Sequence, residues 1–399
     1  MPHPSLDEAL RQEFARRRHH NQLRSRRCIR TLDSTHVEID GRTCVNFASN
    51  NYLGLTHHPR LLAALHDAQQ AGGAGSGASP LISGFSPAHA AAEQALARWK
   101  STEAALLLPS GYQAAHAAVG ALAAIGALRL DARFLADKLC HASLLDAVAA
   151  TRCPLRVFPH NGLPKLRRLL DDAPPQQLQV VLTESIFSMD GDCADLAVLA
   201  DLKSRRDFFL LLDEAHASGV YGPCGAGYAA EIGLQHIVDA GIVTFSKAMG
   251  LAGGAVCGSR AFCDAIINWG RAYIYSTSIP PALAAAVPVA MQIMHDEPHR
   301  QSRLRDLARR ARSRLSAAGM TIPPGDSPII PIILGSEAAA LDAARRLESQ
   351  SLLAVPIRPP TVPRGTSRLR LTLCCDHTDE ELDRLLDVVL RLRSSRPHA

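Results

Sequence analysis

The chain has 399 residues, of which 47% are hydrophobic and 20% are charged, a composition that excludes intrinsic disorder and predicts more than one packed unit. The formal net charge of +5 comes largely from arginines near both ends. It favours solvated helix faces, and a rim that attracts an anionic substrate or an acidic protein is the alternative. Because only 5% of the residues are aromatic and no nucleic-acid module is recognisable, we expect no nucleic-acid partner.

Cysteine usage and the N-terminal composition bear on where the protein works. The ten cysteines lack C-x-x-C spacing, which predicts reduced thiols in the cytoplasm and no metal site. Acidic residues among the N-terminal arginines argue against a signal or transit peptide. The alanine-rich stretch 117–128 is too short to span a bilayer, so we expect no membrane association.

Residues 46–291 alternate short apolar runs with helical patterns, and residues 1–45 precede them as an N-terminal segment. This alternation predicts a large α/β domain with a mostly parallel central sheet. The clearest strands are continuously apolar, as expected where both faces are covered, and they are 179–182, 208–212 and 242–245.

Residues 292–399 have a different pattern, which predicts a smaller α+β domain. A helix rich in arginine and leucine is expected at 300–318, followed by strands at 327–334 and 368–373. The second strand alternates arginine with leucine, which is typical of a half-exposed antiparallel strand. Thr378 and Glu381 form the signature of a capping box at the start of a final helix. We expect the basic N-terminal helix to pack on or near this domain.

Asp213 directly follows the apolar run 208–212. A carboxylate at the end of a buried strand is costly to desolvate unless it meets a cation, and a protonated pyridine nitrogen is one such partner. A fixed carboxylate there would keep the ring protonated as an electron sink. A helix N-cap is an equally good interpretation of Asp213 from this motif alone.

Lys247 follows the strand at 242–245 and precedes a loop rich in glycine. This position suits an amine that forms an imine with a bulky ligand, and burial beside a cationic ring would lower its pKa. A surface lysine that covers apolar area is the alternative for a lone lysine. Upstream, Gly111 and Tyr112 lie between an apolar run and a long helix, where backbone N–H groups and the helix dipole favour a phosphate.

Three further residues follow strand ends or sit in the same kind of loop. His141 is placed to stack on an aromatic cofactor, and Ser188 is placed to bond a phenolic oxygen. His216 lies three residues after Asp213. Each has an ordinary alternative, as a core or capping histidine or a turn serine. Their joint appearance at successive strand ends is harder to explain by turn chemistry, because ligands collect at this edge of a parallel sheet.

Seven segments spread over nearly the whole chain resemble those of the α-oxoamine synthases, a family of pyridoxal-phosphate enzymes of fold type I. The resemblance implies a homodimer with active sites at the subunit interface. The segments are 50–55 (NNYLGL), 139–145 (LCHASLL), 183–192 (TESIFSMDGD), 213–219 (DEAHASG), 244–250 (TFSKAMG), 275–281 (YSTSIPP) and 357–373 (IRPPTVPRGTSRLRLTL).

The resemblance also implies a role for each matching residue. In the cofactor site, Lys247 forms a Schiff base with pyridoxal 5'-phosphate, Asp213 holds the ring nitrogen and His141 stacks on the ring. Ser188 and His216 lie near the ring oxygen. Contacts to the cofactor or its phosphate come from Gly111, Tyr112 and Thr244, and from Ser276, Thr277 and Ser278 of the partner subunit. Arg358 binds the amino-acid carboxylate, and the remaining substrate contacts are Arg24, His141 and Thr361.

The last two motifs resemble the branch of the family that joins L-alanine to pimeloyl-CoA or to pimeloyl-acyl carrier protein in biotin biosynthesis. An α-oxoamine synthase that uses glycine or another acyl-CoA is the nearest alternative, and a noncatalytic binding protein with the same fold is a more distant one. A dinucleotide-dependent oxidoreductase is disfavoured because the chain lacks the G-x-G-x-x-G fingerprint. The chain departs from the family pattern at Asn51, where aspartate is common, and at Ala78, where glycine is usual.

Overall fold

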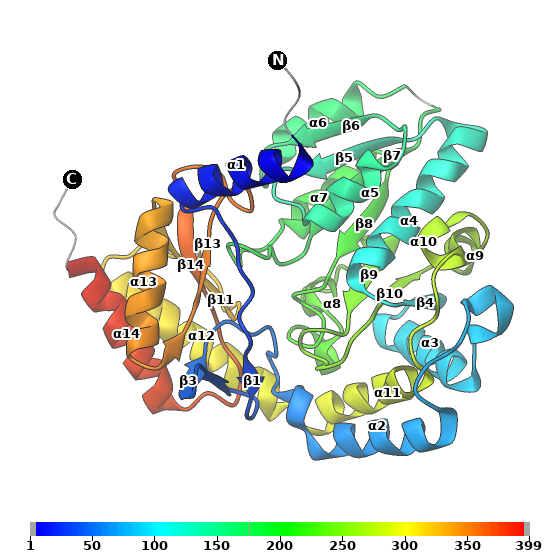
Figure 1. Ribbon diagram of the computed structural model, residues 1–399. Coiled ribbons are helices and arrows are strands. Elements are labelled where there is room, and N and C mark those ends of the chain that lie inside the picture. The colour runs from blue at the N-terminus through cyan, green and yellow to red at the C-terminus, as the bar shows by residue number, and fades with distance from the viewer. Residues whose placement is uncertain (1–4, 175, 395–399) are drawn as a thin grey trace. The chain divides into compact units, whose positions relative to one another are not determined.

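The computed structural model describes residues 5–174 and 176–394, and their contacts divide the chain into two compact units (Figure 1). The sheet unit contains residues 50–188 and 192–303. The terminal unit contains the described residues of 1–49 and 304–399, together with 189–191. The domain boundaries expected at 45/46 and 291/292 remain predictions.

The sheet unit is built on seven strands in the order β4-β10-β9-β8-β7-β5-β6. All strands run in one direction except β10, which is antiparallel to its neighbours β4 and β9, so the expected mostly parallel sheet is confirmed. The strands are β4 (Ala104–Leu108), β5 (Arg133–Asp137), β6 (Leu155–Phe158), β7 (Gln179–Glu184), β8 (Phe209–Asp213), β9 (Ala240–Thr244) and β10 (Gly254–Gly258).

Helices cover both faces of this sheet, which explains why its strands are apolar without interruption (Figure 1). Along β7, Val180 and Leu182 pack with α4, α5 and α9, whereas Val181 packs with α6 and α7 on the opposite face. The helices of this unit are α2 (Pro59–Gly72), α3 (Pro87–Lys100), α4 (Gly111–Ile125), α5 (Ala142–Ala149), α6 (Leu163–Asp171), α7 (Leu196–Arg205), α8 (Tyr228–Glu231), α9 (Arg260–Trp269), α10 (Arg271–Ile274) and α11 (Pro281–Asp296).

The terminal unit holds two small sheets, β1-β2-β3-β12 and β11-β14-β13. Thr378 and Glu381 make the expected capping box, with each backbone N–H bonded to the other side chain, at 2.9 and 3.1 Å. Its elements are α1 (Leu6–His19), β1 (Arg30–Thr31), β2 (His36–Ile39), β3 (Arg42–Asn46), α12 (His299–Ala317, in this unit from Leu304), β11 (Ile329–Gly335), α13 (Glu337–Ser349), β12 (Leu352–Leu353), β13 (Val355–Ile357), β14 (Ser367–Thr372) and α14 (Asp379–Ser394).

The expectation of a half-exposed strand at 368–373 is wrong in one respect. The strand β14 is antiparallel as expected, but it is the middle strand of its sheet and every one of its residues is buried. Its arginines are tolerated because their guanidinium groups have polar partners. Arg368 pairs with Asp190 of the same unit, and Arg370 donates to the hydroxyl of Thr372.

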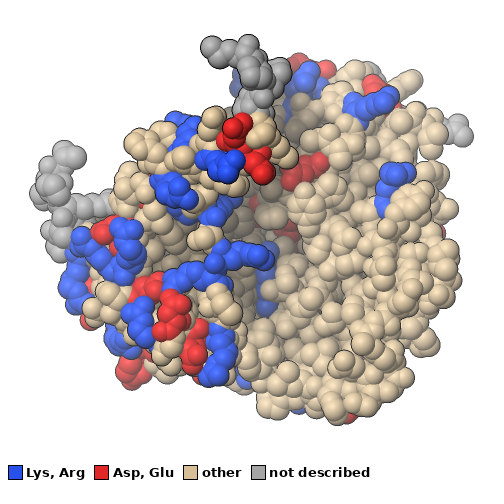
Figure 2. Space-filling view, viewed as in Figure 1, with Lys and Arg blue, Asp and Glu red and all other residues tan. Residues whose placement is uncertain are grey.

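Charged side chains are unevenly distributed over the surface (Figure 2). They gather over α13 and α14 of the terminal unit, whereas the visible face over α3, α10 and α11 of the sheet unit carries few. Within the described residues, no helix is both long and apolar enough to cross a membrane. All ten cysteines are free thiols.

A glutamate of α3 accepts a hydrogen bond from the edge strand of the sheet. The backbone N–H of Leu107, in the edge strand β4, donates to Glu93 Oε1 at 2.9 Å. Burial raises the pKa of Glu93 to about 7, although the bond from Leu107 opposes this shift. Because the folded protein holds the proton more tightly than the unfolded chain, the stabilisation from this group is present below pH 4.5 and lost as pH rises through 7.

The substitution Glu93→Gln should therefore stabilise the fold at alkaline pH. A neutral amide oxygen accepts the same hydrogen bond without the cost of a buried charge. We expect the free energy of unfolding to rise by about 3 kcal/mol at pH 8 and to be nearly unchanged at pH 4.5, as measured by urea unfolding at both pH values. An equal effect at the two pH values would contradict this account.

Candidate active site

A cavity of about 280 Å³ lies at the carboxyl ends of the parallel strands of the sheet unit, where ligands collect in α/β folds. It brings together residues from the carboxyl ends of five strands, β4, β5, β7, β8 and β9, and from the connections that follow them. Seven of the residues expected in the cofactor site line it, namely Gly111, Tyr112, His141, Asp213, His216, Thr244 and Lys247.

Two carboxyl groups meet at one edge of this cavity. Asp213 ends β8 and Glu184 ends β7, and the two residues are register partners across the parallel pair. Both are buried, with exposures of 7% and 2%. Burial raises the pKa of Asp213, and Lys247 opposes that shift. Burial and then Asp213 raise the pKa of Glu184 well above its ordinary value, so this edge accommodates one negative charge more readily than two.

The local structure excludes one of the two interpretations of Asp213. Its Oδ1 accepts the backbone N–H of Ala215 at 2.9 Å, but residues 214–222 form a turn rather than a helix. Asp213 is therefore not a helix N-cap. The carboxylate at this strand end lines the cavity instead.

Lys247 lies on the loop after β9, half-buried, and its side chain lines the cavity. The glycine three residues later allows this loop to pack closely. Gly250 has a φ of +68°, and a Cβ there would lie 2.6 Å from the backbone nitrogen of Thr56. The loop that carries Lys247 therefore requires glycine at position 250. This close packing favours an amine directed into the cavity over a surface lysine.

Two histidines contribute to the cavity in different ways. His216 is buried, and its Nδ1 lies 2.6 Å from the hydroxyl of Tyr52. His141 is the N-cap of α5, where its Nδ1 accepts the backbone N–H of Ser143 at 3.2 Å. Burial lowers the pKa of His141. His141 is therefore a capping histidine and also a cavity residue, so the two interpretations of it do not exclude each other.

The start of α4 forms another wall of the cavity. Ser110 caps this helix by accepting the N–H of Gln113 at 3.1 Å, and Gly111 and Tyr112 follow it. The phenol of Tyr112 donates to Asp146 at 2.9 Å, which raises the pKa of Tyr112. The expected strand, turn and helix N-terminus are all present at this position.

Among the described residues, Ser188 does not line the cavity although we expect it there, and Ser276, Thr277 and Ser278, expected at the partner subunit's phosphate, do not line it either. Ser188 is buried, and its N–H donates to Glu184 at 3.1 Å. The segment 276–278 lies against α4 and the loop at 76–84. There, Gln113 donates to the Ser276 hydroxyl at 2.9 Å, and the Ser278 N–H donates to the carbonyl of Ala78 at 3.0 Å.

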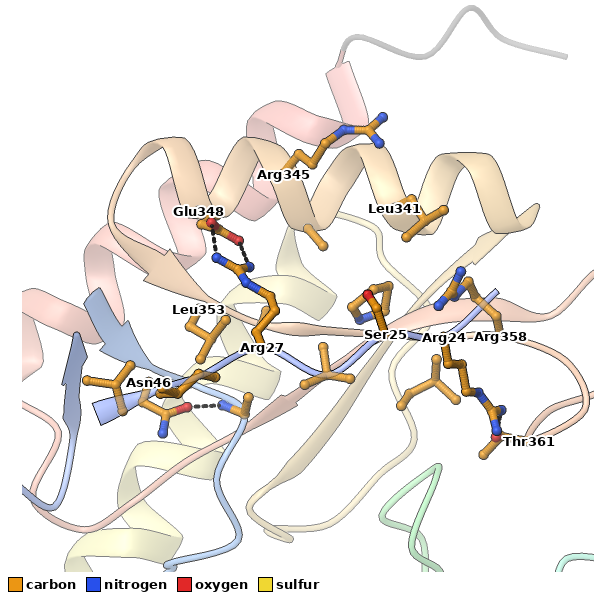
Figure 3. Close-up of a pocket in the computed structure, with 18 of the residues that line it drawn as sticks. Arg24, Ser25, Arg27, Asn46, Leu341, Arg345, Glu348, Leu353, Arg358 and Thr361 are labelled. Carbon is orange, nitrogen blue, oxygen red and sulfur yellow. Dashed lines mark hydrogen bonds and ion pairs between the residues drawn. The ribbon is translucent and has the colours of Figure 1, made fainter. Parts of the chain in front are cut away.

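Three of the four expected substrate contacts, Arg24, Arg358 and Thr361, lie in a second cavity, of about 970 Å³, within the terminal unit (Figure 3). Arg24 donates to the Thr361 hydroxyl at 2.8 Å, and Arg358 donates to the carbonyl of Asn21. Burial, and then the charge of Arg24, lower the pKa of Arg358. Because two guanidinium groups converge there, this cavity suits an anionic group.

Sequence reasoning missed Glu184 of the cavity and a buried ion pair that lies outside the cavity lining. Glu184 ends a strand as Asp213 does, and this position was the available signal for it. Glu214 forms a buried ion pair with Lys100 at 2.5 Å, and Lys100 also donates to the carbonyl of Ala226. The two partners are 114 residues apart in the sequence, so no local pattern connects them.

The departure at Asn51 is accommodated locally. Asn51 is buried, and its amide donates to the Thr56 hydroxyl at 2.8 Å while its oxygen accepts the Thr56 N–H at 3.3 Å. An asparagine fits here because the side chain both donates and accepts, which an ionised aspartate cannot do.

Comparisons with known proteins agree with this geometry. The sequence matches the family described as aminotransferase class I and II over residues 42–389. The chain belongs to this family. The expected resemblance and the expected α/β fold are therefore confirmed.

Curated relatives and solved structures cover nearly the whole chain. The 8-amino-7-oxononanoate synthase of Anaeromyxobacter dehalogenans is 42% identical over 363 residues, which are 91% of this chain and 90% of the relative. The enzyme of the same name from Methylobacillus flagellatus is 38% identical over 392 residues, or 98% and 97% of the two chains. A structure of SPT with its PLP internal aldimine has a TM-score of 0.90 at 26% identity and covers 98% of this chain and 99% of its own.

Proposed function

We propose that the chain joins L-alanine to a pimeloyl thioester, with release of CO2 and the free thiol, to form 8-amino-7-oxononanoate. The observation that carries this proposal is the meeting of the Lys247 amine and the buried Asp213 carboxylate in one cavity. Relatives about 40% identical over most of the chain, which are 8-amino-7-oxononanoate synthases, support the choice of reaction.

Pyridoxal 5'-phosphate is the cofactor, and the residues of the sheet-unit cavity fit it. Lys247 supplies an amine for the aldehyde, and Asp213 supplies a carboxylate for the ring nitrogen. The N-terminus of α4 supplies backbone N–H groups for the phosphate. A Cβ at Gly111 would lie 3.2 Å from the Thr244 Cβ, so the glycine keeps this wall open.

When bound, the cofactor supplies an electron sink for negative charge at the α-carbon of the amino acid. Asp213 would hold a proton on the ring nitrogen, and His141 would stack on the ring. Lys247 Nζ would hold the cofactor, and its amine would serve as the general base for the α-proton. Ser188 and His216 would bond the ring oxygen, and the contact between His216 and Tyr52 fixes the direction of that imidazole.

Substrate binding is assigned to the terminal unit and to His141. Arg358 binds the carboxylate of L-alanine, because a guanidinium forms paired hydrogen bonds with a carboxylate. Arg24 and Thr361, which are bonded to each other, contact the acyl substrate. The acyl group arrives on coenzyme A or on an acyl carrier protein.

We further propose that the protein is a cytoplasmic homodimer. The segment 80–84 contacts α10, and this region exposes a group of large apolar side chains. Exposed apolar patches of this kind mark interaction surfaces, and a second copy is the commonest partner. Ser276, Thr277 and Ser278 adjoin the patch, and they would reach the cofactor phosphate of the partner. The exposed side chains are Leu81 at 49%, Ile82 at 80%, Phe85 at 45% and Tyr275 at 71%.

The substitution Ile82→Glu should break this dimer, because it places a charge in an interface that excludes water. We expect light scattering to give twice 42.8 kDa for the native chain and 42.8 kDa for the variant. Val198→Glu, at a partly exposed apolar position on α7, is the matched control and should stay dimeric. A native chain with the mass of one protomer would overturn the dimer.

The reaction is tested by mixing the protein with cofactor, L-alanine and pimeloyl-CoA and measuring 8-amino-7-oxononanoate by mass. Lys247→Ala should abolish the product, because it removes the covalent anchor and the base together. Lys165→Ala, at an exposed lysine of α6, should leave turnover at the native level. Native turnover by Lys247→Ala would contradict the mechanism.

Parallel reactions with glycine or with acetyl-CoA test the choice of substrates. Faster product formation with either would instead support another α-oxoamine synthase. Cofactor binding without any product from these donors would favour a noncatalytic binding protein.

A further inference from the structure

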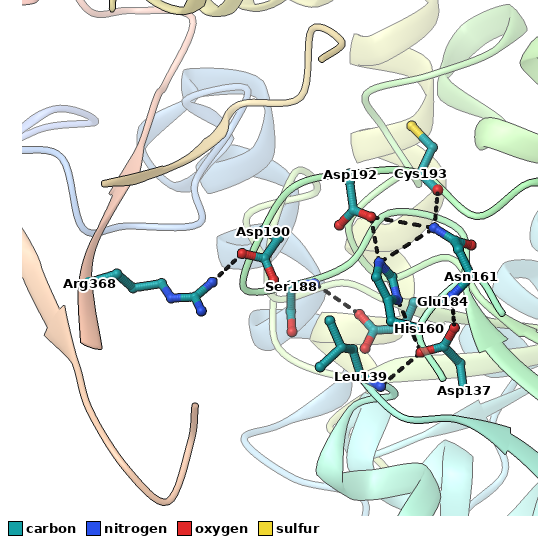
Figure 4. Close-up of polar contacts among 10 residues, drawn as sticks. All are labelled: Asp137, Leu139, His160, Asn161, Glu184, Ser188, Asp190, Asp192, Cys193 and Arg368. Carbon is teal, nitrogen blue, oxygen red and sulfur yellow. Dashed lines mark hydrogen bonds and ion pairs between the residues drawn. The ribbon is translucent and has the colours of Figure 1, made fainter. Parts of the chain in front are cut away.

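An imidazole joins two loops at the edge of the sheet that carries the cofactor site (Figure 4). His160 Nδ1 lies 3.1 Å from Asp137 Oδ1, and its Nε2 lies 2.6 Å from Asp192 Oδ2. Asp137 ends β5, and Asp192 lies in the loop after β7. The ring also packs edge-on against Phe187, with centroids 4.3 Å apart.

Asn161, which follows His160, connects the same two loops. The backbone N–H of Asn161 donates to Asp137 Oδ2 at 2.8 Å, and its side-chain amide donates to the carbonyl of Cys193 at 3.1 Å. Asn161 holds a φ of +49°, a conformation that asparagine tolerates better than most residues. Two successive residues therefore bridge the same pair of loops.

Each loop leads to a residue that the proposed function places against the cofactor. Asp137 Oδ1 also accepts the N–H of Leu139 at 2.8 Å, which shapes the turn that ends at His141. On the other loop, the N–H of Phe187 donates to the carbonyl of Asp192 at 2.9 Å, and Ser188 follows directly.

The charges favour a protonated imidazole at this position. A neutral imidazole has one N–H, whereas the two carboxylates of Asp137 and Asp192 require two donors. Burial opposes protonation, but the hydrogen bonds to Asp137 and then to Asp192 outweigh it and raise the pKa of His160 to about 10. Because Asp137 is only 1% exposed, an imidazole without a charge would leave a buried carboxylate poorly compensated.

We propose that His160 is a positioning residue that, as a cation between Asp137 and Asp192, fixes the two loops carrying His141 and Ser188. It does not touch the reacting atoms. The inference rests on the proposed cofactor contacts of His141 and Ser188, but it does not depend on which amino acid or thioester the enzyme uses.

The test measures cofactor binding without any substrate. His160→Gln removes the cation while it keeps one donor, and it should raise the dissociation constant of pyridoxal phosphate about tenfold and shift the visible absorption band of the bound cofactor. Asp192→Asn leaves the pair of His160 with Asp137 in place, so it should change the dissociation constant and the absorption band less. Because Asp192 is partly exposed, this second variant keeps the test valid if His160→Gln fails to fold.

A double variant separates positioning from general destabilisation. If the two side chains act together, His160→Gln combined with Asp192→Asn should bind the cofactor within about twofold of His160→Gln alone. His236→Gln, at an exposed histidine of the same unit, is the matched control and should bind as the native protein does.

Two outcomes would overturn the proposal. One is a folded His160→Gln variant that binds pyridoxal phosphate with the native dissociation constant and gives the native absorption band, even if its melting temperature is lower. The other is an Asp192→Asn variant with the native dissociation constant for pyridoxal phosphate and the native absorption band. Since no amino acid or thioester is present, neither outcome bears on the choice of substrates.

Discussion

The site depends on a carboxylate that is buried at the end of an apolar strand. Asp213 and Glu184 end adjacent parallel strands as register partners, and helices cover both faces of their sheet. Burial raises the pKa of both carboxyl groups, and the nearby charge of Lys247 opposes this for Asp213. A cationic heterocycle held by Asp213 on one side and by Lys247 on another would satisfy this constraint, as the proposed function requires.

The sequence predicted the parts of the site that follow from local order along the chain. A continuous apolar run identifies a buried strand, and the residue after it must lie at the edge of the sheet. This reasoning placed Asp213 and Lys247 correctly at the cavity, and the structure has strands close to the three expected runs. The capping box at Thr378 was predictable for the same reason, because both of its bonds connect residues three apart.

The parts that escaped prediction depend on partners distant in the sequence. The pair of Lys100 with Glu214 and the bridge of His160 to Asp137 and Asp192 form only when crossover connections bring their elements together. The burial of β14 escaped for a related reason. Alternating arginine and leucine indicates a half-exposed strand unless a carboxylate pairs with the buried arginine. Asp190 is that partner for Arg368, and no local pattern in the sequence identifies it.

A crystal structure of the protein with pyridoxal phosphate tests the central claim most directly. The account predicts continuous electron density from Lys247 Nζ to the cofactor and the Asp213 carboxylate within hydrogen-bonding distance of the ring nitrogen. Density joined to another lysine, or a ring nitrogen directed away from Asp213, would contradict it.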